Sequence, residues 1–357
     1  MTLESLGWHD FFKAFFAPYG EKGLSAGRVA VQHRDRYVLY GDQGEIWAHV
    51  TGKFRHDATV SDAYPAVGDW VAFQPPLNND EGRIHAVLER RSKISRKVAG
   101  AKTEEQVLAA NVDVVFFVMG LDGNFNIRRL ERALSASWES GARPVVVLNK
   151  ADLCVTLQEH VQTVEQAAPG VAVVTMSASR KEGLDTFLGH LPAGTTGVLI
   201  GSSGVGKSTI TNALLGTDRQ AVAEVRSADS RGRHTTSRRE LLLLPSGGMI
   251  IDSPGIRELQ FWGSGEGISE QFEDIESIAR QCRFNDCTHQ QEPACAIKEA
   301  LENGTIEPER WKSYLKLQRE LHYLYLKQND KAARLEKEKW KKLMKIAKQS
   351  LKRKYEP

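Results

Sequence analysis

Short apolar runs separated by turn residues dominate the first quarter of the chain. Five runs rich in Val, Ile, Tyr and Trp, each bounded by Gly, Asp, Asn or Pro, occupy 27–34, 36–41, 45–52, 67–74 and 83–90. This pattern is typical of β-strands. We expect a small β-barrel over 26–95, with an OB-fold favoured and an SH3-like barrel as the alternative. Residues 1–25 are an N-terminal extension, and the polar, basic residues 96–107 are expected to be a linker.

The pattern changes over 108–265, where longer apolar runs alternate with amphipathic segments. Buried strands are indicated by the apolar runs at 112–120, 144–149, 171–176 and 197–201. Helical periodicity lies between them, over 127–140, 156–168 and 182–189. Such alternation predicts a mostly parallel sheet with helices on both faces, so that the chain as a whole is a multidomain α/β protein.

The last part of the chain has a helical pattern. It covers 266–330, with a long charged helix expected from about 308 onward, and it is followed by a basic tail at 331–357. The tail contains eleven Lys or Arg residues and three Glu residues. Its basic and apolar positions fit an amphipathic helix that binds phosphate groups. A solvated helix face explains the same pattern equally well, and the sequence does not separate the two.

Composition narrows the class of protein. At 357 residues the chain exceeds one typical domain, and its apolar content of 41% suffices for packed cores. Its net charge of +3 alone does not indicate binding to nucleic acid. The N-terminus lacks a basic start followed by an apolar core, so we expect no secretory signal. No apolar stretch approaches the length of a membrane span. We expect a cytoplasmic monomer with no membrane partner.

A glycine-rich stretch at 201–208 matches the phosphate-binding pattern G-x-x-x-x-G-K-S. An apolar strand precedes it and a helical segment follows, which favours a phosphate loop over a simple turn that caps a helix. Backbone N–H groups and the helix N-terminus bind the phosphates, Lys207 reaches the β- and γ-phosphates, and Ser208 binds Mg²⁺. The nucleotide-binding residues expected here are Gly201, Ser202, Ser203, Gly204, Val205, Gly206, Lys207, Ser208 and Thr209.

A guanine-binding sequence follows the strand at 144–149. Asp152 can accept hydrogen bonds from the N1–H and the amine of guanine, and adenine offers neither donor. Asn149 is expected to tie this loop to the phosphate loop, and the stem of Lys150 to cover the base. The next strand ends in a Ser-Ala-Ser sequence whose backbone suits the guanine carbonyl. Together the expected base-binding residues are Asn149, Lys150, Ala151, Asp152, Ser177, Ala178 and Ser179.

These motifs occur in an unusual order. In ordinary GTPases the phosphate loop precedes the Asn-Lys-x-Asp sequence, whereas here 149–152 precede 201–208. We therefore predict a circularly permuted P-loop GTPase domain whose phosphate sensors lie towards the C-terminus. Its expected cofactors are GTP or GDP with Mg²⁺.

Two further segments are placed to sense the γ-phosphate. Asp252 and Gly255 belong to a D-x-x-G sequence, in which the Asp holds Mg²⁺ through water and the Gly N–H contacts the γ-phosphate. The polar, basic segment 232–236 has little periodicity and is expected to be a mobile switch loop. Of its two threonines we favour Thr236 as a ligand of Mg²⁺, beside Ser208.

The residue that follows the D-x-x-G sequence is Ile256, where Ras-like enzymes have a Gln that orients the attacking water. A hydrophobic side chain cannot align water. We predict that His234, close to the expected magnesium-binding threonine, takes this role, so that the catalytic residues are His234, Lys207 and Thr236. The alternative is a surface imidazole that contacts RNA or nothing.

Three cysteines and a histidine lie close together after the switch segments. Their spacing is C-x4-C-x-H-x5-C, formed by Cys282, Cys287, His289 and Cys295. Soft sulfur and nitrogen ligands in this number suit a tetrahedral, structural Zn²⁺. Buried free cysteines are the alternative, and Cys154, which stands apart, is interpreted in that way.

In this order, the motifs resemble those of the ribosome small-subunit-dependent GTPase A family over about 26–300. The resemblance implies an OB-fold, a permuted GTPase domain and a helical zinc-binding domain in that order. It also implies a late assembly factor of the small (30S) ribosomal subunit that contacts rRNA near the decoding region, with slow GTP hydrolysis stimulated by the subunit. The family's catalytic His maps onto His234, and Ser237 departs from the family by replacing a common third Thr.

Two other functions are compatible with parts of the sequence. One is a GTP-gated RNA-binding module with incidental hydrolysis, which Ile256 favours. The other is a nucleotide kinase or ATPase, which Asp152 and the switch sequences disfavour. Aromatic and basic residues of the barrel could contact RNA, although aromatic residues of β-strands more often belong to the core. The candidates are Tyr37, Trp47, Phe54, Arg55 and His56.

Overall fold

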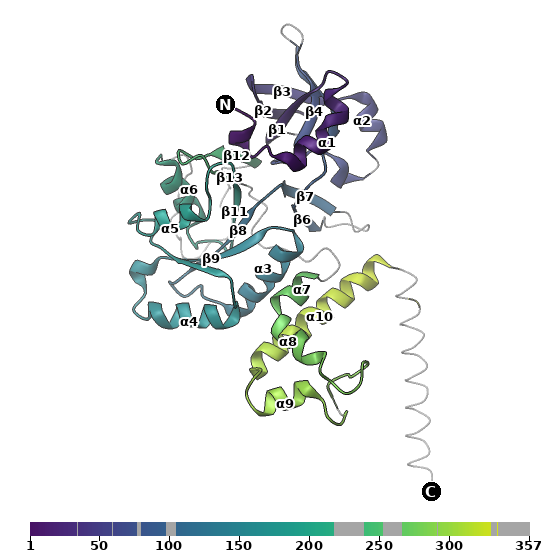
Figure 1. The fold of residues 1–357 in the computed structure, drawn as a ribbon. Coiled ribbons are helices and arrows are strands. Elements are labelled where there is room, and N and C mark those ends of the chain that lie inside the picture. Colours follow the sequence, from purple (N-terminus) through teal and green to yellow (C-terminus); the bar gives the residue numbers. More distant parts are fainter. Residues whose placement is uncertain are drawn as a thin grey trace.

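The computed structural model describes residues 1–33, 35–58, 60–76, 80–97, 105–217, 239–252, 266–290, 292–329 and 334. Figure 1 shows three parts along the chain, namely a barrel, a central α/β domain and a C-terminal group of helices. The predicted fold class is confirmed by this arrangement and by the strand order. In the described ranges, no helix is both long and apolar enough to cross a membrane.

The barrel contains the five predicted strands. They are β1 (Ser25–Gln32), β2 (Tyr37–Gly41), β3 (Gly44–Val50), β4 (Trp70–Gln74) and β5 (Gly82–Val87), with helix α2 (Gly52–Asp57) after β3. Their order is β1-β2-β3-β5-β4, and pairing of β1 with β4 closes the barrel. Alternate side chains fill its interior, among them Val29, Leu39 and Ile84. This closed five-stranded barrel has OB-fold topology, which settles the choice against an SH3-like barrel.

The N-terminal extension is part of the barrel's packing. It forms a short 3-10 helix, η1 (Glu4–Leu6), and the helix α1 (Asp10–Gly20). Trp8 lies against Trp70 of β4 with ring centroids 4.6 Å apart, and Phe12 also contacts Trp70 at 5.8 Å. These buried aromatic rings fix α1 on the barrel through apolar area and edge contacts.

The central domain is a mostly parallel sheet covered on both faces. Its strands are β8 (Val114–Gly120), β9 (Arg143–Asn149), β10 (Ala172–Thr175), β11 (Thr196–Ile200), β12 (Arg239–Leu243) and β13 (Met249–Asp252), in the order β10-β9-β8-β11-β13-β12. Helices α3 (Ile127–Glu139) and α4 (Leu157–Ala167) cover one face, and α5 (Leu184–Gly189) and α6 (Lys207–Leu215) the other. Among these described strands, β12 alone runs antiparallel to its neighbours. Strands buried on both faces explain the continuous apolar runs of the sequence.

Two pairings join the parts in a way that the sequence did not indicate. Strand β12 pairs with β13 on one side and with β1 of the barrel on the other, so that barrel and central domain share one eleven-stranded sheet. The expected linker over 96–107 overlaps two antiparallel strands, β6 (Lys93–Lys97) and β7 (Glu105–Ala110), while 98–104 lie outside the described residues. The polar residues of β6 and of the start of β7 concealed these strands, although Val107–Ala110 of β7 are all buried.

A buried arginine fastens the barrel to the central domain. The Arg28 guanidinium donates hydrogen bonds to the carbonyl oxygens of Leu6, of Gly68 at 3.2 Å and of Asn111 at 3.2 Å. Burial lowers the pKa of Arg28 to about 10, so the group stays charged at neutral pH. Because unpaired buried carbonyls are costly, this one side chain stabilises the junction of three separate segments.

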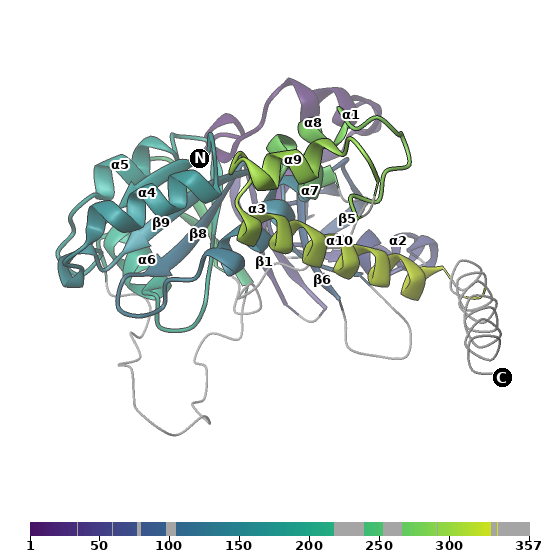
Figure 2. The ribbon, with the colours of Figure 1, turned by 90° about the horizontal axis from the view of Figure 1, so that it is seen from below.

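The C-terminal domain lies against α3. Its helices are α7 (Glu266–Gln271), α8 (Glu273–Ala279), α9 (Ala296–Glu302) and α10 (Pro308–Gln328), and Figure 2 shows α7 and α10 beside α3. Gly267 packs so closely on α3 that a Cβ there would lie 2.0 Å from the Ser135 oxygen. Arg310 binds both carboxylate oxygens of Asp274 at 2.8 Å and the Ala167 carbonyl at 3.0 Å. The helices are thus fixed to the central domain through close packing and paired charge.

Candidate nucleotide site and metal centre

The phosphate loop joins β11 to α6 at the carboxyl edge of the sheet. Gly201, Gly204 and Gly206 have φ angles of 141°, 82° and 96°, which residues with a Cβ rarely adopt. A Cβ on Gly206 would also lie 2.3 Å from the Asn149 amide nitrogen. The glycines of the motif are therefore required by backbone conformation and by the close approach of Asn149 at the end of β9.

The start of α6 offers an anion-binding end. Lys207, Ser208 and Thr209 form its first turn, and no side chain caps the helix. Its leading N–H groups and partial positive charge favour a phosphate group there. The Lys207 ammonium donates to the carbonyl oxygens of Gly201 and Ser202, each at 2.7 Å, so its charge lies within the curve of the loop.

Asn149 connects three loops at the end of β9. Its amide nitrogen donates to the Val205 carbonyl at 2.8 Å, and its amide oxygen accepts from the Ala178 N–H at 3.1 Å. Only 2% of this residue is exposed. Lys150 follows with a φ of 64°, and its ammonium pairs with Asp122 after β8. The Asn-Lys-x-Asp, phosphate and Ser-Ala-Ser segments therefore meet at one place.

Asp152 has one carboxylate oxygen without a hydrogen-bond partner among the described residues. This oxygen, Oδ1, is shielded from solvent, and the side chain is 10% exposed. Its other oxygen lies 3.6 Å from Arg180 Nε. A hydrogen bond from the Ser177 hydroxyl holds the pKa of Asp152 below its ordinary value, so the group is ionised at neutral pH. A shielded acceptor of this kind marks the place of a donor group, as the N1–H and amine of guanine would supply.

The sequence-predicted phosphate sensors are described only in part. Asp252 ends β13, which runs parallel to the phosphate-loop strand β11, so it reaches the same edge of the sheet. Thr236, Gly255 and the catalytic candidate His234 lie outside the described residues, as does Ile256. The described residues therefore include the phosphate loop and the segments predicted to bind the base.

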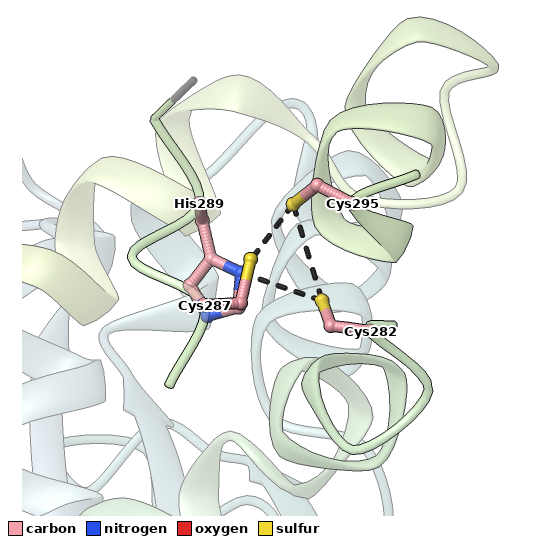
Figure 3. Close-up of side chains that lie close together, drawn as sticks. All are labelled: Cys282, Cys287, His289 and Cys295. Carbon is pink, nitrogen blue, oxygen red and sulfur yellow. Dashed lines mark hydrogen bonds between the residues drawn. The ribbon is translucent and has the colours of Figure 1, made fainter. Parts of the chain in front are cut away.

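The four predicted metal ligands converge. Figure 3 shows Cys282, Cys287, His289 and Cys295 facing a common point, and their ligand atoms all lie within 4.8 Å of one another. Tetrahedral zinc, with Zn–S near 2.3 Å and Zn–N near 2.0 Å, needs about 3.8 Å between sulfurs and about 3.5 Å from sulfur to nitrogen. The Sγ atoms of Cys282 and Cys295 are 3.9 Å apart. His289 Nδ1 lies 3.5 Å from the Cys282 sulfur and 3.4 Å from the Cys295 sulfur. The arrangement fits a four-coordinate structural zinc ion.

The surroundings of the cluster favour metal binding as well. Burial lowers the pKa of His289, so its imidazole is neutral and has a lone pair available at neutral pH. The ring packs edge-on against Trp311 of α10 at 5.7 Å. Cys154 lies apart from the cluster, partly buried, with its sulfur 3.7 Å from His160 Nδ1. The metal centre therefore links the loop after α8 with α9 and α10.

Sequence reasoning missed the side chains that support the phosphate loop from the segment after β8. Asn124 and Arg129 both contact Ser202 of the loop. No motif includes them, and their distance from the loop along the chain hides the contact. The nearest sequence signal is their neighbour Asn126 at the start of a helical pattern, which indicates a helix cap rather than a nucleotide site.

Comparison with known proteins identifies the family. The sequence model of the RsgA GTPase family matches residues 87–262. A protein of Opitutus terrae named small ribosomal subunit biogenesis GTPase RsgA is 46% identical, with 96% of each chain covered. This chain belongs to the RsgA GTPase family. A family member from Oceanobacillus iheyensis, which carries the same name with the number 1, is 48% identical over 88% of this chain and 90% of its own.

Solved structures agree with this family and with the permuted fold. YjeQ from Thermotoga maritima superimposes with a TM-score of 0.64 and 27% identity, covering 84% of this chain and 98% of its own. YloQ, described as a circularly permuted GTPase, has a TM-score of 0.62 and 24% identity over 84% of this chain and 95% of its own. The predicted permuted GTPase fold is confirmed, and the RsgA family assignment makes this chain a GTPase.

Proposed function

We propose that this chain is a GTPase that binds the small ribosomal subunit and hydrolyses GTP to GDP and phosphate late in 30S maturation, with hydrolysis stimulated by the subunit. The observation that carries the proposal is the meeting of Asp152, Asn149 and the phosphate loop at one edge of the sheet. The names of the RsgA relatives, which cover nearly the whole chain, support the ribosomal partner.

The proposed chemistry assigns each group a task. Asp152 accepts hydrogen bonds from guanine, Lys207 neutralises charge on the β- and γ-phosphates, and Ser208 with Thr236 holds Mg²⁺. Asp252 would help to hold the metal, and the Gly255 N–H would contact the γ-phosphate. Mg²⁺, when bound, stabilises the charge that develops on the phosphate oxygens. His234 orients or deprotonates the attacking water, because Ile256 offers no polar group for this purpose.

The remaining assignments concern the partner and the second metal. One Zn²⁺ held by the Cys282 cluster shapes the C-terminal domain. Trp47 of the barrel is 47% exposed and stacks on His33 at 5.2 Å, which supports contact with unpaired rRNA bases, whereas Tyr37 is buried in the barrel core. The protein acts as a cytoplasmic monomer, as expected for a factor that docks on a ribosomal subunit.

Replacing His234 by Ala tests the catalytic assignment. We expect the turnover of GTP in the presence of small subunits to fall by about 10²-fold or more, because a positioned general base contributes that much. The affinity for GTP should change little, since the base and phosphate contacts remain. Steady-state turnover and titration with labelled GTP give the two values.

The matched control is His190→Ala, which removes an imidazole at the end of α5, where the His190 carbonyl contacts Arg143 at the start of β9 rather than at its phosphate-loop end. It should turn over GTP like the wild type. Equal stimulated turnover in His234→Ala and the wild type would show that His234 is not the catalytic group.

A further inference from the structure

The first half of the phosphate loop is held by side chains outside the nucleotide motifs. Arg129 Nη1 donates one hydrogen bond to the Ser202 hydroxyl oxygen at 2.8 Å and another to Asn124 Oδ1 at 2.9 Å. The Ser202 hydroxyl donates to the same Asn124 oxygen at 3.0 Å. The three side chains form a closed ring of hydrogen bonds, and one member of the ring is a residue of the phosphate loop.

The position of Arg129 is set by the start of α3. Asn126 caps this helix, with its Oδ1 accepting from the Arg129 backbone N–H at 3.0 Å. The cap places Arg129 in the first turn, directly before the fully buried Leu130 and near the equally buried Leu134. The guanidinium therefore extends from a fixed backbone towards the phosphate loop.

The other side of α3 is held by the C-terminal domain. Arg128, the neighbour of Arg129, pairs with Glu309 of α10 at 2.6 Å, and Arg132 pairs with Glu320 at 3.1 Å. Gly267 of α7 packs directly on the backbone of the same helix. Because α3 lies between the central sheet and these helices, as Figures 1 and 2 show, it gives Arg129 a rigid base.

The Arg129 guanidinium beside the phosphate loop favours the binding of phosphate groups in two ways. Ser202 and its neighbours supply the backbone N–H groups that surround the phosphates. A loop whose side chain is already fixed loses less conformational freedom when an anion binds. The guanidinium also adds positive charge beside the anion, and hydrogen bonds from a charged donor are stronger than neutral ones.

We propose that Arg129 is a positioning residue for the phosphate loop, acting through Ser202 and Asn124, and that it raises the affinity of the loop for the phosphates of GTP and GDP. The inference rests on the nucleotide site of the proposed function. Arg129 makes no contact with the base-binding residues Asn149 and Asp152 in this arrangement, so it affects affinity without affecting the choice of base.

The test compares Arg129→Gln with the wild type. We expect affinities for labelled GTP and GDP to fall by about tenfold to a hundredfold, the loss typical of a hydrogen bond to a charged group. The KM for GTP should rise by a similar factor with kcat within about threefold, because the lost contact exists before and during the reaction. The preference for GTP over ATP should be unchanged. Arg129→Lys should recover part of the affinity, since an ammonium keeps the positive charge but lacks the planar, two-pronged donor geometry of a guanidinium.

Two further variants separate positioning from general damage. Arg132→Gln removes a charge from the same helix that faces α10 instead of the loop, and it should bind GTP like the wild type. Adding Ser202→Ala to Arg129→Gln should cost little more than either change alone, because both break the same ring.

Several results would overturn the inference. One is an affinity of Arg129→Gln for GTP within about twofold of that of Arg132→Gln. Another is a full additivity of the affinity losses of Arg129→Gln and Ser202→Ala. The third is a reduced preference for GTP over ATP together with a lower unfolding temperature of Arg129→Gln. A wild-type protein that binds no labelled GTP would instead contradict the nucleotide site itself.

Discussion

Replacing Asp152 by Asn is expected to lower the affinity for GTP by about 10²-fold to 10⁴-fold, because two hydrogen bonds to a charged acceptor are lost. The shielded Oδ1 of Asp152 has no partner among the described residues, so a guanine donor is the group that would satisfy it. An Asn amide can instead donate to a carbonyl. Xanthine has a carbonyl where guanine has its amine, and xanthosine triphosphate should therefore bind the variant more tightly than the wild type. Titration with both labelled nucleotides measures the change.

Asp185→Asn is the matched control, since this residue lies in the first turn of α5 and outside the base-binding segments. It should leave both affinities unchanged. An Asp152→Asn protein that binds GTP within about threefold of the wild type would show that this carboxylate does not read the base.

Replacing Cys282, a proposed ligand of zinc, should unfold the C-terminal domain. In Cys282→Ser we expect loss of the single bound zinc and of much of the helix content of α7 to α10, because structural zinc contributes on the order of 10 kcal/mol to small domains. Helix α9 begins directly after the ligand Cys295, so its start depends on the metal centre. The central sheet has its own core and should remain folded. Metal analysis, circular dichroism and thermal unfolding together test this expectation.

Cys154→Ser provides the comparison, because Cys154 lies outside the cluster. It should keep one zinc per chain and unfold like the wild type. A Cys282→Ser protein with wild-type helix content and unfolding temperature would contradict a structural role for the metal.

The sequence predicted those features that depend on local pattern. Alternating Val, Ile and Tyr residues placed the five barrel strands, and the glycines of 201–206 placed the phosphate loop between a strand and a helix. The spacing from Cys282 to Cys295 predicted a cluster of metal-ligating side chains, and their ligand atoms do lie within 4.8 Å of one another. The sequence order of the guanine and phosphate motifs was enough to predict the permutation.

Features that depend on tertiary contact were beyond such reasoning. Strand β12 has an ordinary pattern, and only the folded chain shows that it joins β1 to β13. Arg28 looks like an exposed strand residue until Leu6, Gly68 and Asn111 surround it. Arg129 likewise acquires its contact with Ser202 through the parallel order of β8 and β11, which no local pattern encodes.

We propose above all that this chain, a member of the RsgA GTPase family, hydrolyses GTP in response to the small ribosomal subunit. The most direct test is the steady-state turnover of GTP by the wild-type protein with purified small subunits, with large subunits and with neither. We predict that small subunits alone raise kcat by about tenfold or more, because they complete a site in which Ile256 cannot orient water. Equal turnover in all three samples would contradict the account and leave a GTP-gated RNA-binding module in its place.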